Sequence, residues 1–157
     1  MSKTLWLLRH GDAEDPRGSD FDRRLTARGE RQSRAAGRAL ARLDLRFEHV
    51  FTSPRVRALD TARLACSELA IEPIVHQPLS ADFGDDDAAE LLAATSDGGA
   101  LLLVGHEPDL SSLVAGYTGA HIVMKKGGIA AIRLDGRLGE LALLLRPREI
   151  EFLAGLR

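Results

Sequence analysis

Runs of largely apolar residues recur along the chain, each with the length of a buried β-strand. They cover residues 3–8, 50–52, 74–76, 100–104, 129–134 and 140–145. Segments with helical periodicity separate the first four runs, and strands that alternate with helices form parallel sheets. The last two runs flank the turn sequence Asp135-Gly136, which predicts an antiparallel hairpin. The pattern predicts an α/β fold: a three-layer sandwich with a mostly parallel central sheet, helices on both faces and an antiparallel C-terminal hairpin.

The predicted helices have recognisable starts and faces. One follows Thr26, a typical N-cap residue. Its apolar positions are Ala36, Leu40 and Leu43, and its basic positions are Arg31, Arg34, Arg38 and Arg42. An arginine stripe of this kind is typical of a solvated helix face. A second helix is predicted to run to about residue 70, with Ser53 as N-cap and Pro54 in its first turn. Shorter helices are predicted over residues 88–94 and 108–116.

Basic and imidazole side chains stand where three of the parallel strands end. They are Arg9 and His10 after the first strand, Arg55 and Arg57 after the second, and His106 after residues 100–104. Because the carboxyl ends of parallel strands share one edge of a sheet, these side chains should meet in one cleft, and Gly11 allows a sharp turn there. The helix that starts at Ser53 adds unpaired N–H groups, which favour an anion. Helix positions two apart point about 200° apart, so we expect only one of Arg55 and Arg57 to face that anion.

Composition and charge narrow the class of protein. With 157 residues, of which 45% are hydrophobic, the chain can bury one core, and we expect a single domain over residues 1–157. The formal net charge of −2 gives no general attraction to nucleic acid or to an anionic membrane. Cys66 has no partner for an internal disulfide, and the chain shows neither a signal-type segment nor an apolar run near the roughly 20 residues of a membrane span. We therefore expect a cytoplasmic protein without nucleic-acid or membrane partners.

Three short motifs surround the predicted strand ends. They are Leu8-Arg9-His10-Gly11, Ser53-Pro54-x-x-Arg57-Ala58-x-x-Thr61-Ala62 and Val104-Gly105-His106. In this order they resemble the histidine phosphatase superfamily, also called phosphoglycerate mutase-like. Within it, Asp12 after the first motif, the segment Arg23-Arg24-Leu25-Thr26-x-x-Gly29 and the small size are similar to the SixA-type phosphohistidine phosphatase branch. The resemblance runs from residue 3 to about residue 134, and Arg24 stands where that branch usually has Pro.

The resemblance implies a role for each motif residue. His10 is the nucleophile that becomes phosphorylated. Arg9, Arg57 and His106 complete the catalytic pocket around it and bind the phosphate. Arg23 matches an additional phosphate-binding arginine of the SixA branch. The spacing of the family motif also selects Arg57, rather than its neighbour two residues earlier, as the arginine of the site.

These residue types suit phosphoryl transfer. Cationic donors stabilise charge on the equatorial oxygens of an in-line transition state, and the planar arginine fork can bridge two of them. A neutral imidazole nitrogen can attack phosphorus and form a covalent intermediate that water then cleaves, and nearby arginines should keep His10 neutral near pH 7. No metal or cofactor is required, and no metal-ligand spacing such as His-Glu-x-x-His is present. We expect His49, His76 and His121 to be surface or packed histidines.

A proton donor for the leaving group is harder to find. Many members of the superfamily have a glutamate in the segment after the third strand, whereas residues 79–85 contain none. Asp82, Asp85 or Asp86 could take its place, and Asp12 could donate a proton or only stabilise its loop. An imidazole leaving group, with a conjugate-acid pKa of about 6.5, needs less protonation than an alkoxide, which favours phosphohistidine as the substrate.

Three functions from different classes remain open. The first is hydrolysis of phosphohistidine on a signalling or phosphotransfer protein, which would be the partner. The second is a phosphatase or mutase for a small phosphorylated metabolite, which is disfavoured because the chain lacks the insertions that normally cap such substrates in this family. The third is a phosphate-recognition module without catalysis. The intact His10 argues against it, because a receptor gains more from another cation than from a neutral nucleophile.

Overall fold

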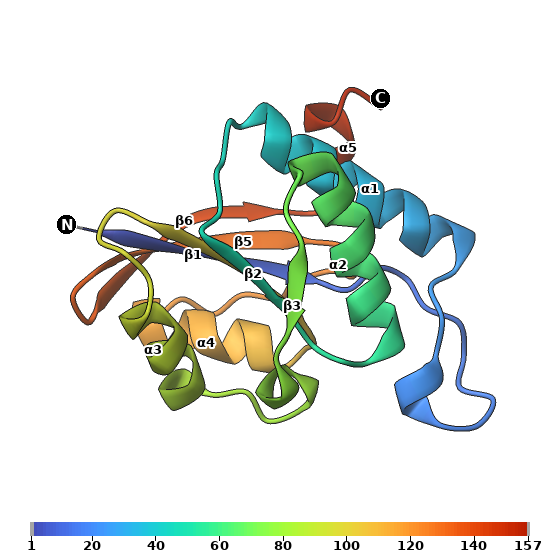
Figure 1. Ribbon diagram of the computed structural model, residues 1–157, viewed down its shortest axis with the longest axis horizontal. Helices are drawn as coiled ribbons and strands as arrows, with labels where there is room; N and C mark the ends of the chain where they lie inside the picture. Colours follow the sequence, from blue (N-terminus) through green and yellow to red (C-terminus); the bar gives the residue numbers. More distant parts are fainter. Residues whose placement is uncertain (1, 157) are drawn as a thin grey trace.

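Within residues 2–156, which the computed structural model describes, six strands form one mixed sheet (Figure 1). Met1 and Arg157, the two ends of the domain expected from the sequence, lie outside the described residues. The strands are β1 (Lys3–Arg9), β2 (His49–Thr52), β3 (Pro73–Val75), β4 (Ala100–Gly105), β5 (Ile129–Asp135) and β6 (Leu138–Leu145). Their order is β3-β2-β4-β1-β5-β6; the first four run parallel, β5 is antiparallel to β1, and β6 is antiparallel to β5. The mostly parallel sheet with an antiparallel C-terminal hairpin is confirmed.

Helices cover both faces of this sheet, which confirms the three-layer sandwich. They are α1 (Ala27–Arg42), α2 (Val56–Leu69), α3 (Asp85–Ala93), α4 (Asp109–Thr118) and α5 (Pro147–Leu153), with short 3-10 helices η1 (Asp20–Asp22) and η2 (Gln77–Ser80). Figure 1 shows α1, α2 and α5 on one face and α3 and α4 on the other. Trp6 and Leu8 of β1 belong to the core under the first group, and Leu5 and Leu7 to the core under the second. Because successive side chains of a strand alternate between faces, a strand covered on both sides is apolar throughout.

Helix α1 has the two sides that the sequence predicts. The Thr26 hydroxyl accepts a hydrogen bond from the Gly29 N–H at 3.0 Å and caps the helix. Ala36 and Leu40 are fully buried, whereas Leu43 is 40% exposed because it follows the last helical residue. The four arginines of the predicted stripe are all exposed, as expected for a solvated face.

Other helix boundaries differ from the prediction. α3 begins at Asp85, three residues before the predicted start at residue 88, because the Asp87 carboxylate accepts a hydrogen bond from the Gly84 N–H at 2.8 Å and supports the first turn. α4 ends at Thr118, two residues later than predicted. The pattern does not predict α5, because its seven residues are too few to show a helical period. None of the described helices is long and apolar enough to cross a membrane.

The chain that leaves β1 packs closely against α1 through two glycines. A Cβ on Gly29 would lie 2.0 Å from the Asp12 carbonyl oxygen, and a Cβ on Gly11 would lie 2.6 Å from the Gly29 carbonyl oxygen. Gly11 is not among the residues with positive φ, so close approach, rather than the sharp turn expected from the sequence, is what requires glycine there. This backbone contact fixes the segment after His10 against the start of α1.

Candidate active site

His10 is the first residue after β1 and is almost fully buried, with 6% of its surface exposed. Its backbone N–H donates to the Gly105 carbonyl oxygen at 3.1 Å, which ties His10 to the end of β4. Its ring Nδ1 lies 2.7 Å from the Gly11 carbonyl oxygen. A carbonyl oxygen can only accept, so Nδ1 carries the ring proton and Nε2 keeps its lone pair. The geometry therefore leaves Nε2 as the nitrogen that can attack an electrophile.

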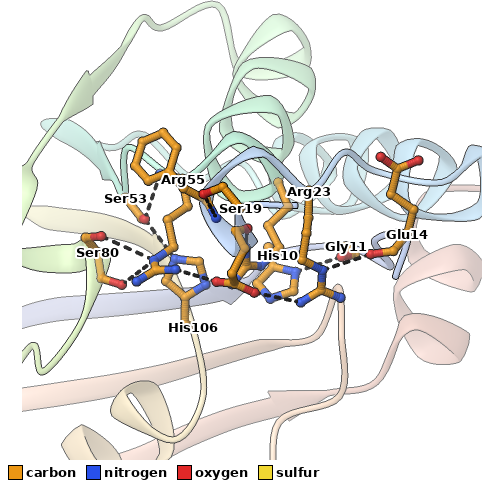
Figure 2. A network of polar contacts seen from close by, with 12 residues as sticks. His10, Gly11, Glu14, Ser19, Arg23, Ser53, Arg55, Ser80 and His106 are labelled. Carbon is orange, nitrogen blue, oxygen red and sulfur yellow. Dashed lines mark hydrogen bonds and ion pairs between the residues drawn. The ribbon is translucent and has the colours of Figure 1, made fainter. Parts of the chain in front are cut away.

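The ring of His106, the first residue after β4, lies beside that of His10, with 5.2 Å between the ring centroids (Figure 2). Its Nε2 is 2.7 Å from the Ser53 hydroxyl oxygen, which also accepts a hydrogen bond from the Arg55 N–H at 3.2 Å. In the tautomer in which the hydroxyl donates its proton to His106 Nε2, Nδ1 carries the ring proton. That Nδ1 is buried and has no hydrogen-bond partner among the described residues. In this tautomer a buried N–H donor is available to a ligand oxygen.

Both imidazoles are neutral at physiological pH. Burial lowers the pKa of His10 to about 4, and the nearby charges of Arg57 and Arg9 act in the same direction, against the hydrogen bond to Gly11. Burial likewise lowers the pKa of His106 to about 3, with the neighbouring histidine and arginines acting in the same direction. The sequence predicts that nearby arginines keep His10 uncharged. In the structure burial is the main cause of the lowered pKa, and the arginines are a smaller one.

Three arginines meet around Asp20, a residue of η1 that the sequence patterns do not single out. Arg57 donates to the Asp20 carbonyl oxygen at 2.8 Å and to its carboxylate Oδ2 at 3.2 Å. Arg23 donates to Oδ1 at 3.2 Å, and Arg55 pairs with Oδ2. Figure 2 shows Arg23 and Arg55 extending toward the two imidazole rings from opposite sides. A carboxylate of the chain itself therefore lies among the guanidinium groups expected to bind phosphate.

The expectation that only one of Arg55 and Arg57 faces a bound anion does not account for the contact of both with Asp20. It assumed that both lie inside the helix, where positions two apart point about 200° apart. α2 begins at Val56, two residues later than predicted, although the Ser53 hydroxyl accepts a hydrogen bond from the Arg55 N–H as well as contacting His106. Arg55 is consequently the N-cap residue, with extended backbone angles (φ −61°, ψ 136°). Its guanidinium reaches the same carboxylate oxygen as that of Arg57.

Arg9 approaches the site from the end of β1. Its Nη1 donates to the Met124 carbonyl oxygen at 2.8 Å, and its Nε is buried without a partner. Among the residues that the structure describes, four buried side-chain nitrogens lack a hydrogen-bond partner, and three of them belong to Arg9, Arg57 and His106. Buried polar atoms nearly always have partners. Three such donors in one place indicate a site for a ligand that accepts hydrogen bonds.

Of the three carboxylates after the third strand that were expected as proton donors, two lie far from His10. Asp85 and Asp86 line a cavity of about 750 Å³ together with Lys3, at the start of β1. His10 follows the end of this seven-residue strand, about 20 Å away. Asp85 and Asp86 are therefore too far from His10 to protonate a leaving group. Asp82 is exposed and lies close to the end of η2.

Asp12 and Asp20, two of the carboxylates near the pocket, are ionised. Asp12 stabilises its loop: its Oδ2 accepts from the Thr26 hydroxyl at 2.8 Å, its Oδ1 lies 3.4 Å from Lys126, and the Thr26 bond is the main reason that the pKa of this carboxyl is lowered. Burial raises the pKa of the Asp20 carboxyl, but the surrounding arginines outweigh it and lower the pKa overall. Of the two roles left open for Asp12, the contacts favour loop stabilisation. Neither group is a strong proton donor at neutral pH.

The remaining histidines lie outside this pocket. His49 and His76 each pack against Phe51, and His121 is exposed, as expected from the sequence. Within residues 2–156, no group of three or more His, Cys, Asp and Glu side chains is arranged to hold a metal ion. Cys66 is buried in the core beneath α1 and α2.

Comparison with known proteins gives matches in both sequence and structure. Residues 5–90 match the family described as the histidine phosphatase superfamily (branch 1). An uncharacterised protein of Picosynechococcus sp. is 40% identical over 161 residues, which cover 92% of this chain and 96% of that protein. The 2,3-bisphosphoglycerate-dependent phosphoglycerate mutase of Sinorhizobium fredii is 38% identical over 93 residues, which cover 54% of this chain and only 44% of the mutase. The solved structure of the protein histidine phosphatase SixA complexed with tungstate has a TM-score of 0.85 at 27% identity, and covers 94% of this chain and 99% of its own.

Proposed function

The chain belongs to the histidine phosphatase superfamily, and we propose that it is a phosphatase that hydrolyses the N–P bond of phosphohistidine on a signalling or phosphotransfer protein. The observation that carries the proposal is the neutral, buried His10 ring, with Nε2 free, among donors whose buried nitrogens lack partners. A nucleophile of this kind beside such donors suits phosphoryl transfer. The similarity to SixA, a protein histidine phosphatase, supports the same substrate class.

In the first half of the proposed reaction, His10 attacks the substrate. Its Nε2 forms a bond to phosphorus, and the bond between phosphorus and the substrate imidazole breaks. The leaving nitrogen keeps the electron pair and takes a proton from solvent. Arg9, Arg57 and the Nδ1–H of His106 hold the phosphoryl oxygens while charge develops on them, and Arg23 adds a further donor from the segment after η1.

In the second half, water cleaves the phosphorylated His10. The water oxygen bonds to phosphorus, the bond to Nε2 breaks, and the electron pair returns to the ring while the proton of water passes to phosphate or solvent. The hydrogen bond from Nδ1 to the Gly11 carbonyl oxygen, at 2.7 Å, keeps the ring proton in place throughout. The ring therefore departs as a neutral imidazole and is ready for the next substrate. Neither half of this scheme uses a metal or a cofactor.

The carboxylates around the pocket support an imidazole leaving group. Asp20, which contacts three arginines, has a lowered pKa and is therefore a weak proton donor at neutral pH. An alkoxide leaving group needs a strong donor because the pKa of its conjugate acid lies far above neutrality, whereas that of imidazole is about 6.5. Among the substrates considered, phosphohistidine depends least on protonation of its leaving group by a side chain of the pocket.

A phosphatase or mutase for a small phosphorylated metabolite is the second candidate, because of the similarity to the phosphoglycerate mutase of Sinorhizobium fredii. A substrate panel separates the two. We expect the protein to hydrolyse a phosphohistidine peptide and an aryl phosphate, and to hydrolyse a phosphoserine peptide and 3-phosphoglycerate at least about a hundredfold more slowly. Faster turnover of 3-phosphoglycerate than of the phosphohistidine peptide would show that the protein acts on a small phosphorylated metabolite instead.

The covalent intermediate can be trapped directly. Acid-labile phosphate should appear on the wild-type protein within a single turnover of the aryl phosphate, and His10→Ala should remove both this signal and steady-state turnover. His121→Ala changes an exposed histidine outside the pocket and is the matched control. A chelator should leave the rate unchanged, and a persistent requirement for a divalent metal would contradict the scheme.

A further inference from the structure

A groove rich in basic residues lies beside the site, between the start of α1, Lys125 with Lys126, and α5. Its volume is about 870 Å³, and seven of its eleven lining residues are arginine or lysine, against two acidic ones. The whole chain has a formal net charge of −2, so this positive charge is a local concentration. We refer to this feature as the basic groove.

The side chains of four cations of the basic groove form neither a hydrogen bond nor a salt bridge with another described residue, although the charge of Arg28 contributes to the lowered pKa of Asp12. The other three are engaged: Arg9 with the Met124 carbonyl oxygen, Lys126 with Asp12 and Arg146 with Glu149. The four exposed side chains without a hydrogen bond or salt bridge to another described residue are Arg28, Arg31, Lys125 and Arg148. Farther along α1 the situation differs, because Arg34 and Arg38 pair with Glu30 and Glu68. Within the arginine stripe, Arg31 at the groove has neither a salt bridge nor a side-chain hydrogen bond among the described residues, and Arg42 at the far end donates to the Leu153 carbonyl oxygen.

The basic groove adjoins the pocket around His10. Arg9 lines the groove and directly precedes the nucleophile in sequence. The Gly127 N–H donates to the carbonyl oxygens of both Arg9, at 3.1 Å, and His10, at 2.9 Å, so the segment that carries Lys126 is fastened to the end of β1. The charge of Lys126 also reaches His10, where it contributes to the lowered pKa. A substrate whose phosphoryl group lies at His10 can thus extend over the groove.

We propose that the basic groove docks an acidic segment of the phosphoprotein substrate, close in that protein to its phosphohistidine; this rests on the proposed function. Exposed cations on long side chains attract an acidic polypeptide and speed its association without a tight fit. None of the eleven lining residues is aromatic, whereas single-stranded nucleic acids are held by stacking on aromatic side chains. A small metabolite is normally held by an apolar pocket with a few fixed polar groups, which exposed lysines and arginines do not provide.

The test uses three synthetic peptides, each phosphorylated on one histidine. One has about six acidic residues on the amino side of the histidine, the second has them on the carboxyl side, and the third has glutamine in their place. At low salt we expect one acidic peptide to have a KM at least about tenfold below that of the glutamine peptide, with an equal kcat. The difference should shrink in 1 M salt, where the Debye length falls to about 3 Å.

Charge reversal locates the effect. Arg31→Glu and Arg148→Glu should each raise the KM for the acidic peptide about fivefold, without changing kcat, and the double variant should raise it further. Arg46→Glu is the matched control, since Arg46 is also exposed but precedes β2, at the opposite edge of the sheet from His10. An equal rise in KM for Arg46→Glu would show a general charge effect and overturn the docking site.

Binding of the unphosphorylated acidic peptide, measured by fluorescence anisotropy, separates this proposal from the proposed function. Equal KM values for all three peptides, or equal anisotropy binding by wild type and Arg31→Glu, overturn docking and leave the proposed function intact. If no phosphohistidine peptide is hydrolysed although an aryl phosphate is, the proposed function fails, and the anisotropy comparison alone decides docking. Displacement of the acidic peptide by a tighter-binding oligonucleotide of equal charge would overturn the choice of a protein segment as the occupant.

Discussion

The imidazole of His10 should stay uncharged well below neutral pH, and acidification is the perturbation that tests this. Burial lowers its pKa to about 4, from an ordinary value of about 6.5. At pH 5 a group with a pKa of 4 is about 90% neutral, whereas an unburied histidine is about 3% neutral. The surroundings of His10 therefore raise the fraction of the nucleophilic form about thirtyfold at that pH.

Two-dimensional NMR of ¹⁵N-labelled protein measures this directly, because imidazole nitrogen shifts report both the charge and the tautomer. The variant His10→Gln assigns the signals, and a short unstructured histidine peptide gives the unburied reference. We expect a midpoint near pH 4. Above the midpoint the proton should be on Nδ1, because the Gly11 carbonyl oxygen, at 2.7 Å, can only accept it.

Two results would refute the reasoning. A midpoint at pH 6 or above would show that burial does not control the charge of His10. A proton on Nε2 at neutral pH would show that the attacking nitrogen is wrongly identified. The variant Arg57→Met tests the order of causes: removal of one cation should raise the midpoint, but by less than burial lowers it, because burial is the largest cause.

Further measurements test the packing and the charges around the pocket. Asp20→Asn should tighten tungstate binding about fivefold in calorimetry, because Arg57 and Arg23 lose a competing anion; weaker binding would contradict that role. Gly29→Ala should lower the free energy of unfolding in urea by about 2 kcal/mol, because its Cβ would lie 2.0 Å from the Asp12 carbonyl oxygen, whereas Gly18→Ala, with open space around it, should not. Stability should fall between pH 6.5 and 4, by up to about 3 kcal/mol from His10, because the unfolded chain binds this proton and the folded one does not; equal urea midpoints at pH 7 and pH 4.5 would contradict this.

The sheet could be predicted closely because its central strands are covered on both faces. A strand of this kind is a continuous apolar run, and the run at residues 3–8 corresponds to β1 at Lys3–Arg9. The helix boundaries were less predictable, because they depend on which group each hydroxyl or carboxylate bonds. Ser53 has the sequence of an N-cap, and its hydroxyl bonds both to the Arg55 N–H and to His106, which is 53 residues away. No pattern of neighbouring residues predicts the bond between Ser53 and His106.

The same distinction holds for the site. His10, Arg57 and His106 could be selected because they lie in motifs at strand ends, and the fold brings all three to one edge of the sheet. Asp20 could not, because an acidic residue in a segment rich in Gly, Pro and Asp is typical of a solvated turn. Its contacts with Arg57 join residues 37 positions apart and depend on how η1 folds over the start of α2.

On the proposed function, Asp20 gives the cation cluster a counter-charge before and after each turnover. Arg23, Arg55 and Arg57 repel one another at close range, and one carboxylate among them offsets part of that repulsion. The Asp20 side chain is 50% exposed, so it can exchange these contacts for water at modest cost. A phosphoryl group brings up to about two negative charges where Asp20 brings one, and binding therefore replaces a weaker anion with a stronger one. When inorganic phosphate leaves, the Asp20 carboxylate can return to the guanidinium groups. This return favours product release, because tight binding of the anion would otherwise limit the rate at that step.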